Sequence, residues 1–362
     1  MRRLNRTVAL LLALLLAVAG AGPAVGAPLE DHQAENACSF PLTRTDATGT
    51  AVTVEDDPDR VVALHASAAQ TMWEIGGSGE VVGMPVNRYT SYLEGYQRPR
   101  DVVAADEFTV VVEGVVNASP DLVLAPNVTP VETVSKLRSA GLTVYHFEAA
   151  RTIEDVYAKT LLTGQLTGNC DGAAERTARM RVRIDRVREA VADEPRPTVI
   201  YPLGGGVVAG NGTFLHELIT TAGGRNLAAD AGIDGYRPIS AEEIEAADPD
   251  WLILNEDLPR SAVQMDAYNR TTAVERDQIV RINPNYANQP APRIAVVVEQ
   301  LARALHPGVL AEANATAAPG TATTAPSTAP ATSSGGQPGF GLAVALAALA
   351  VALLTARRGR RP

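Results

Sequence analysis

The sequence predicts an α/β fold that is built twice, as two lobes with parallel sheets joined by one long helix. Five short stretches (VVALH, LVLA, LTVYHF, TVIY and WLIL) are nearly continuous apolar runs. Such runs are typical of strands in parallel sheets that are covered on both faces. The order of strand, loop and helix occurs once in each half of the chain. Between the halves, residues 171–193 carry apolar side chains at helical spacing.

Two sequence signals repeat between the halves. RVVALHASAAQTMWEIGG and, later, TFLHELITTAGG each predict a helix that ends in Gly-Gly. NASPDLVLAPN and AADPDWLILNED each place a Pro-Asp pair, Pro120-Asp121 or Pro249-Asp250, before an apolar strand. Proline lacks an amide hydrogen and disfavours helical geometry in the residue before it, so each pair ends one helix and begins the next strand.

The connecting segment predicts a single helix with Asp171 as its N-cap and Pro195 just beyond its end. Its predicted apolar face comprises Ala173, Met180, Ile184, Val187 and Val191. Ahead of the first lobe, PLTRTDATGTAVTV predicts a β-hairpin that turns at Thr48-Gly49.

Both ends of the chain carry targeting features. Residues 1–27 combine three arginines, an apolar run and small residues, the layout of a secretory signal. Residues 311–337 are almost entirely Ala, Thr, Ser, Pro and Gly, which predicts an extended stalk because so little apolar area can be buried. Residues 338–362 begin with Pro-Gly-Phe and continue with an apolar stretch and four arginines.

This C-terminal end is either a permanent membrane helix or a processed anchor. It resembles the PGF-CTERM signal of haloarchaea, which implies cleavage by an archaeosortase and attachment of a lipid, and the position of the tripeptide favours this interpretation. The predicted division of the chain is signal peptide 1–27, N-terminal arm and hairpin 28–58, N-terminal lobe 59–169, linking helix 170–194, C-terminal lobe 195–310, stalk 311–337 and anchor signal 338–362.

Charge and cysteine content agree with export. The formal net charge is −10, and without the seven arginines of the terminal signals 24 basic residues face 41 acidic ones. An acidic surface with only two lysines suits high salt and argues against nucleic acid as a partner. Cys38 and Cys170 are the only cysteines, and an even count in an exported chain predicts a disulfide.

Six segments resemble, in order, the helical-backbone (class III) substrate-binding proteins of ABC importers. They are DATGTAVTV, PDRVVALHASAAQTMWEIGG, VVGM, SPDLVLAPN, GTFLHELITTAGGRN and NQPAPRIAVVVEQLARALHP, and the resemblance covers residues 40–307. It implies two Rossmann-like lobes with a ligand cleft between them, no enzymatic activity, a monomer, and delivery to a membrane permease with its ATPase. The class serves vitamin B12, ferric siderophores and haem. SAAQTMWEIG and NYANQPAPR are most similar to haloarchaeal B12-binding proteins, so a cobalamin is the expected ligand, with a ferric siderophore or haem as the alternative.

The resemblance also implies that a surface acid on each lobe docks onto the importer. The matching positions here, Gln70 and Thr220, are neutral. Other acids such as Glu74 or Glu217 are therefore expected to contact the transporter.

Ligands of parallel sheets bind beyond the carboxyl ends of the strands, so the loops there hold the candidate site. The loop NRYTSYLEGYQ contains three of the nine tyrosines. Aromatic rings in a polar loop suit a flat, amphipathic ligand. The alternative is that these rings only pack within the protein and stabilise a turn. Asn and Gln amides suit the propionamide groups of a corrin. The predicted ligand-binding residues are His65, Ser67, Tyr89, Tyr92, Tyr96, Asn127, Tyr201, Gly205, Asn255, Asp257, Tyr286, Asn288 and Gln289.

An enzyme and a passive surface protein are the alternative classes of function. The chain has no GxSxG elbow, Walker loop or HExxH helix, so no catalytic residue is assigned. His65, His146 and His216 with Glu256 or Asp257 could form a zinc or manganese site, but isolated histidines are more often structural and no metal site is predicted. A passive envelope protein is the third interpretation, and it would lack a ligand-selective cleft.

Overall fold

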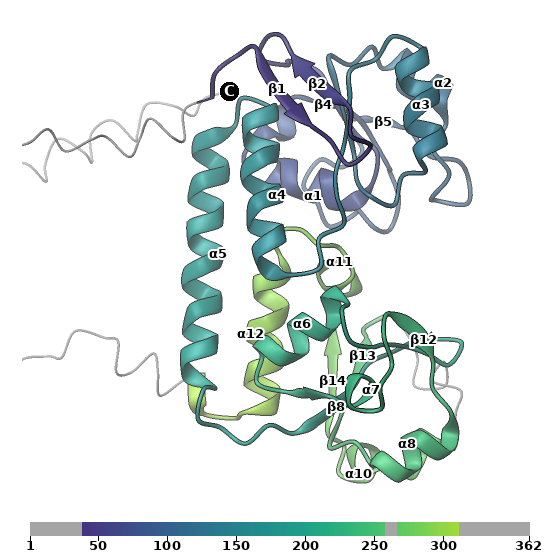
Figure 1. Ribbon diagram of the computed structural model, residues 1–362, viewed down its shortest axis with the longest axis vertical. Helices are drawn as coiled ribbons and strands as arrows, with labels where there is room; N and C mark the ends of the chain where they lie inside the picture. Colours follow the sequence, from purple (N-terminus) through teal and green to yellow (C-terminus); the bar gives the residue numbers. More distant parts are fainter. Residues whose placement is uncertain (1–37, 258–265, 311–362) are drawn as a thin grey trace, which may run out of the picture. The chain divides into compact units, whose positions relative to one another are not determined.

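The computed structural model describes residues 38–257 and 266–310 (Figure 1). The predicted signal peptide, stalk and anchor signal lie outside the described residues. Within the described ranges, no helix is long and apolar enough to cross a membrane.

The N-terminal lobe contains a five-stranded parallel sheet in the order β5-β4-β3-β6-β7. Its strands are β3 (Val61–Ala63), β4 (Val81–Met84), β5 (Arg100–Asp101), β6 (Leu122–Ala125) and β7 (Val144–His146). The helices of this half are α1 (Ala66–Glu74), α2 (Val112–Asn117), α3 (Val131–Ser139) and α4 (Ile153–Leu166), with a short 3-10 turn η1 (Gly77–Gly79). Val61 and Ala63 pack into one core cluster, whereas Val62 and Leu64 pack into another. The sheet is therefore covered on both faces, as the apolar runs predict.

The C-terminal lobe repeats this topology with a parallel sheet in the order β11-β8-β13-β14. The strands are β8 (Thr198–Ile200), β11 (Arg225–Asn226), β13 (Trp251–Asn255) and β14 (Ile279–Ile282). The helices are α6 (Phe214–Thr221), α7 (Leu227–Asp230), α8 (Ala241–Ala247), α9 (Asp266–Asn269), α10 (Thr272–Glu275), α11 (Pro284–Ala287) and α12 (Ile294–Leu305). In each lobe the first strand, β3 or β8, has later strands on both sides, so the predicted duplication is confirmed.

A second sheet in the C-terminal lobe was not predicted. It is antiparallel, with the order β12-β10-β9, and comprises β9 (Pro202–Gly204), β10 (Val207–Ala209) and β12 (Tyr236–Pro238). The glycines 204–206 all have positive φ and form the turn between β9 and β10. The strands are only three residues long, too short for an alternating pattern to mark them.

The two Pro-Asp pairs occupy equivalent places. The Asp121 carboxylate accepts a hydrogen bond from the backbone N–H of Arg60 at 2.9 Å, just before β3. The Asp250 carboxylate accepts one from the backbone N–H of Thr198 at 2.8 Å, in β8. Each pair thus ends one helix and fixes the start of the neighbouring strand.

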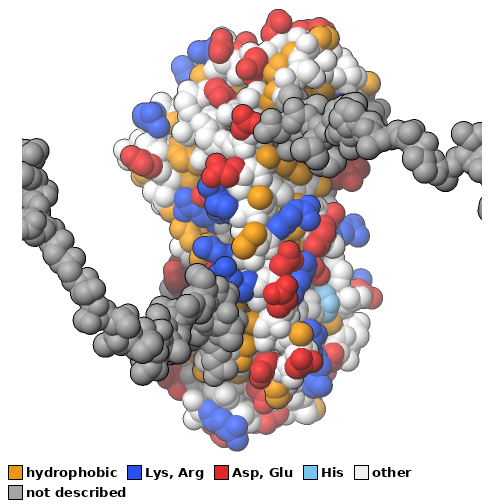
Figure 2. All heavy atoms as spheres, turned by 90° about the vertical axis from the view of Figure 1, so that its left-hand side faces the viewer, with side chains coloured by type: hydrophobic (Ala, Val, Ile, Leu, Met, Phe, Trp, Pro, Cys, Tyr) orange, Lys and Arg blue, Asp and Glu red, His pale blue; other side chains and the backbone are white. Residues whose placement is uncertain are grey.

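One long helix, α5 (Cys170–Ala190), connects the two halves of the chain (Figure 1). Its five predicted apolar residues are all buried and include Met180 and Ile184. The predicted N-cap was wrong: the helix begins at Cys170 with Asn169 as N-cap, and Asp171 lies in the first turn. Helix α5 packs against α4 and α12, and its outer face carries intermixed basic and acidic side chains (Figure 2).

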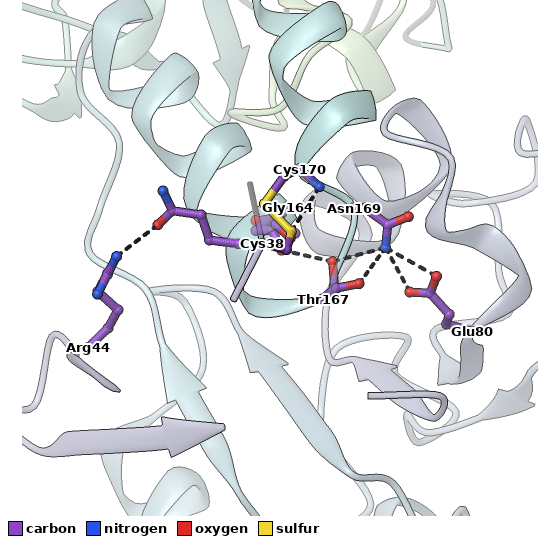
Figure 3. Close-up of a disulfide and its surroundings, with 9 residues drawn as sticks. Cys38, Arg44, Glu80, Gly164, Thr167, Asn169 and Cys170 are labelled. Carbon is purple, nitrogen blue, oxygen red and sulfur yellow. Dashed lines mark hydrogen bonds between the residues drawn. A yellow bond between two sulfur atoms is a disulfide. The ribbon is translucent and has the colours of Figure 1, made fainter. Parts of the chain in front are cut away.

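The N-terminal hairpin comprises β1 (Leu42–Thr45) and β2 (Ala51–Val54), with Gly49 at a φ of 78° in the turn. This agrees with the predicted turn. Just before the hairpin, Cys38 forms a disulfide with Cys170 at the start of α5 (Figure 3). The predicted bridge between the N-terminal arm and the segment between the lobes is therefore confirmed.

Candidate ligand-binding site

A cavity of about 560 Å³ lies where loops at the carboxyl ends of β3, β4 and β6 face residues 284–290 of the C-terminal lobe. This is the edge at which open parallel sheets bind ligands. Six of the predicted ligand-binding residues line the cavity: His65, Ser67, Tyr89, Asn127, Asn288 and Gln289.

The cavity wall also contains apolar residues that the sequence analysis missed. Phe108 and Val128 line the cavity and are 57% and 63% exposed. The rings of Phe108 and Tyr89 lie 5.3 Å apart between centroids and are tilted by 46°. Arg88 lies over the Tyr89 ring and pairs with Glu107 at 3.2 Å. The N-terminal lobe thus offers an aromatic pair that is held in place and open to a ligand. Single apolar residues within the polar segments AADEF and APNVTP were the signal for this wall.

Amide side chains make up much of the polar lining. Asn87 and Asn127 come from the N-terminal lobe, and Asn285, Asn288 and Gln289 come from the C-terminal lobe. Each amide can both donate and accept a hydrogen bond. The cavity can therefore bind a ligand that is apolar on its faces and carries amide or carbonyl groups on its rim.

Two predicted residues lie behind Asn288 rather than in the wall. The Tyr201 hydroxyl donates to Asn255 Oδ1 and lies 3.0 Å from Asn288 Oδ1. Tyr201 and Asn255 are buried, and burial raises the pKa of the Tyr201 hydroxyl. These two residues hold Asn288 in position at the cavity.

The lobes are joined beside the cavity by what we call the interlobe network: Gln70, Glu74, Tyr92, Arg176, Tyr286, Gln289 and Arg293. The Gln70 amide nitrogen donates to the Tyr92 hydroxyl at 2.8 Å, and the Gln70 side-chain oxygen accepts from the Arg293 backbone N–H at 2.8 Å. Glu74 pairs with Arg176 at 2.8 Å and with Arg293 at 2.7 Å.

This network corrects the predicted docking residues in the first lobe. Gln70 is completely buried, and the side chain of Glu74 is only 15% exposed between its two arginines. Neither side chain is available to a protein that docks on the surface. In the second lobe, Glu217 and Thr220 on α6 are both partly exposed.

The remaining predicted tyrosines have packing roles in the structure. Tyr92 and Tyr286 meet edge to face at 5.4 Å, and the Arg293 guanidinium lies over both rings. Tyr96 packs against the core of the N-terminal lobe. None of the three lines the cavity. Tyr92 and Tyr96 therefore match the alternative interpretation, in which the rings of this loop pack against the protein and do not line the ligand site.

Two predicted residues lie away from the cavity wall. Gly205 is at the exposed tip of the β9–β10 turn. Asp257, also exposed, follows β13. The positive φ of Gly205, 60°, is a turn requirement.

The three candidate metal-binding histidines are dispersed. His146 Nε2 lies 3.1 Å from the Thr129 carbonyl oxygen, His216 lies beside Asn226, and His65 lines the cavity. Among the described residues, no three His, Cys, Asp or Glu side chains are close enough to hold a metal ion.

Two lobes with the same parallel topology, a connecting helix and a cavity between loops of both lobes define a solute-binding protein. The chain belongs to the periplasmic binding protein family, whose pattern matches residues 61–291. The predicted family is thereby confirmed.

Similar proteins agree with this assignment. The chain is 42% identical over 342 residues to a protein of Halobacterium salinarum named cobalamin-binding protein, covering 91% of this chain and 92% of that one. A crystal structure of the periplasmic vitamin B12-binding protein of Vibrio cholerae matches with a TM-score of 0.58 at 21% identity, over 71% of this chain and 98% of that one. A structure described as an ABC-type Fe3+-hydroxamate transport system from Saccharomonospora viridis matches with a TM-score of 0.59 at 25% identity, over 74% and 100%.

Proposed function

We propose that this protein is the exported solute-binding component of an ABC importer that captures a cobalamin or related corrinoid and delivers it to a membrane permease and its ATPase. The observation that carries the proposal is the composition of the cavity wall, an aromatic pair with apolar neighbours faced by amide side chains from both lobes. The similarity to a protein named cobalamin-binding protein supports the same ligand. In this role the protein binds and releases its ligand without covalent chemistry.

The chemistry of a corrinoid fits this wall. A corrin macrocycle has broad apolar faces and a rim of amide groups. Phe108 and Tyr89 would pack on a face, and Asn285, Asn288 and Gln289 would bond to the rim. A complete cobalamin is larger than about 560 Å³, so we expect part of it to remain outside the cavity.

A ferric siderophore is the second candidate, and the likeness to the structure described as an Fe3+-hydroxamate transport system favours it. Hydroxamate siderophores also carry amide-like groups, so the amide side chains of the cavity could bond to them equally well. The aromatic wall distinguishes the two candidates, because the flat macrocycle of a corrinoid can pack against more of the aromatic surface than a ferric siderophore can.

Cell-surface anchoring completes the proposal. Residues 1–27 would direct export, and residues 338–362 would be processed by an archaeosortase to attach the protein to the cytoplasmic membrane. The protein would act as a monomer. Glu217 and Thr220, which are partly exposed on α6, would form the part of the docking surface that the C-terminal lobe contributes.

Replacing Phe108 by alanine should weaken cyanocobalamin binding by about tenfold or more, because an aromatic anchor at a cavity wall typically contributes about 2 kcal/mol. Titration calorimetry in high salt would measure the dissociation constants. Val182, which is 61% exposed on α5, provides a matched control: Val182→Ala should bind like the wild type. Equal affinities for wild type and Phe108→Ala would remove the aromatic pair from the site.

A further inference from the structure

Lys159 lies where the two lobes meet at the cavity. It is on α4, and its Nζ lies 3.4 Å from Ser67 Oγ of the N-terminal lobe and 3.4 Å from the Pro290 carbonyl oxygen of the C-terminal lobe. Ser67 and Pro290 both line the cavity. The ammonium group is therefore just behind the wall, next to two atoms of lining residues.

This ammonium group has no acidic partner in the described part of the chain. No ion pair joins Lys159 to a carboxylate there, and its Nζ also lies 5.7 Å from the centroid of the Phe147 ring. The second lysine differs, because Lys136 pairs with Glu132 on the surface at 2.7 Å. Burial lowers the pKa of Lys159 to about 8, so the group is still protonated near neutral pH. The residue as a whole is partly buried, and an ammonium group removed from water is unfavourable unless a counter-charge approaches it.

The His65 side chain is a second polar group beside Lys159. Its Nε2 is buried and has no hydrogen-bond partner among the described residues, although the side chain lines the cavity. Burial, and then the nearby Lys159 ammonium, lower the pKa of His65 to about 4. The imidazole is therefore neutral at physiological pH, and in one tautomer Nε2 carries a hydrogen that it can donate.

We propose that Lys159, Ser67 and His65 form an anion subsite of the cavity, which binds a negatively charged oxygen of the ligand. The ammonium would supply the charge, and the hydroxyl and imidazole would supply hydrogen bonds. This subsite rests on the proposed function, because it assumes that a corrinoid occupies the cavity. In a cobalamin the group that fits is the phosphodiester of the nucleotide loop, since the other side groups of the macrocycle are amides.

The test uses two corrinoids that differ in this group. Cyanocobalamin contains the phosphodiester, whereas dicyanocobinamide lacks it together with the nucleotide. In Lys159→Met the charge is lost and much of the apolar stem is kept. Its affinity for cyanocobalamin should fall about tenfold to a hundredfold, as for the loss of a charged hydrogen bond, and its affinity for dicyanocobinamide should not change. Lys159→Arg, which keeps the charge, should recover part of the loss. Lys136→Met is the matched control and should bind both corrinoids like the wild type.

The outcomes separate the subsite from the proposed function. If Lys159→Met loses affinity equally for both corrinoids, or for neither, the anion subsite is refuted while corrinoid binding stands. If the wild type binds neither corrinoid, the proposed function fails, and haemin with its two carboxylates becomes the probe. Haemin binding that is unaffected by Lys159→Met, or no haemin binding at all, would then also refute the subsite.

A second readout distinguishes binding from a structural role. The chain has only two lysines, so reductive methylation with ¹³C gives one NMR signal for each lysine besides that of the N-terminus. Saturation with cyanocobalamin should raise the pKa of Lys159, because an anion favours the protonated form. Dicyanocobinamide should leave that pKa unchanged. A pKa that responds equally to both ligands would contradict the proposal.

Discussion

Replacing Glu74 by alanine is expected to lower the free energy of unfolding by about 3 to 5 kcal/mol, the usual cost of breaking a buried ion pair from one side. The side chain is only 15% exposed and pairs with both Arg176 and Arg293. Arg176 and Arg293 would lose their shared counter-charge, and Arg176 Nε already has no hydrogen-bond partner in the described structure. Urea unfolding followed by circular dichroism would measure the change.

Two further variants sharpen this prediction. Glu74→Gln keeps the hydrogen-bonding shape without the charge and should lose less stability than Glu74→Ala. Glu132→Ala breaks an exposed pair with Lys136, one helical turn away, and should cost no more than about 0.5 kcal/mol. If Glu74→Ala were no more damaging than Glu132→Ala, the interlobe network would not stabilise the contact between the lobes.

Loss of the disulfide should have the second large effect. The bridge links residues 132 positions apart, so its removal frees a long loop in the unfolded chain. Replacing Cys38 and Cys170 together by serine should lower the free energy of unfolding by about 2 to 5 kcal/mol. Thermal unfolding of the double variant beside the wild type, each with and without reductant, would test it.

The surroundings of the bridge give this prediction its control. The Cys170 backbone N–H contacts Cys38 Sγ at 3.2 Å, and Asn169 donates to Glu80 at 2.9 Å beside it (Figure 3). The hydrogen bond from Asn169 to Glu80 involves neither cysteine and remains in the double variant. Because Cys38 and Cys170 are the only cysteines, the double variant has no disulfide left to reduce, so reductant should not lower its midpoint further. An unchanged midpoint in both the variant and the reduced wild type would mean that the N-terminal arm is held by packing alone.

The fold was largely predictable because its signals are local. Continuous apolar runs mark strands such as β3 and β13, and the buried face of α5 follows the helical period. Asp171 was misplaced as N-cap because Asn169 offers an alternative start two residues earlier, and Asn169 directs its amide to Glu80 instead of the helix end. The β9–β10–β12 sheet gave no signal, because each of its strands is only three residues long, too short for an alternating pattern to mark it.

The site was only partly predictable, because contacts between distant loops decide it. Loops after predicted strands correctly led to His65 and Asn127 in the cavity wall. A single apolar residue in a polar segment marks Phe108 as unusual. Its place in the cavity wall, and the position of Lys159 beside that wall, depend on tertiary packing that no local pattern records. Gln70 was expected on the surface from the family's docking position, yet it is buried because its amide bonds to groups of both lobes.

The most direct test of the central claim is a titration of the purified protein in high salt with cyanocobalamin, a ferric hydroxamate siderophore and haemin. Calorimetry should show saturable binding of one cyanocobalamin per chain, with clearly weaker binding of the other two ligands. Saturable binding of the siderophore or haemin in preference to cyanocobalamin would keep the solute-binding role and contradict the corrinoid. No saturable binding of any of the three would contradict the proposed function.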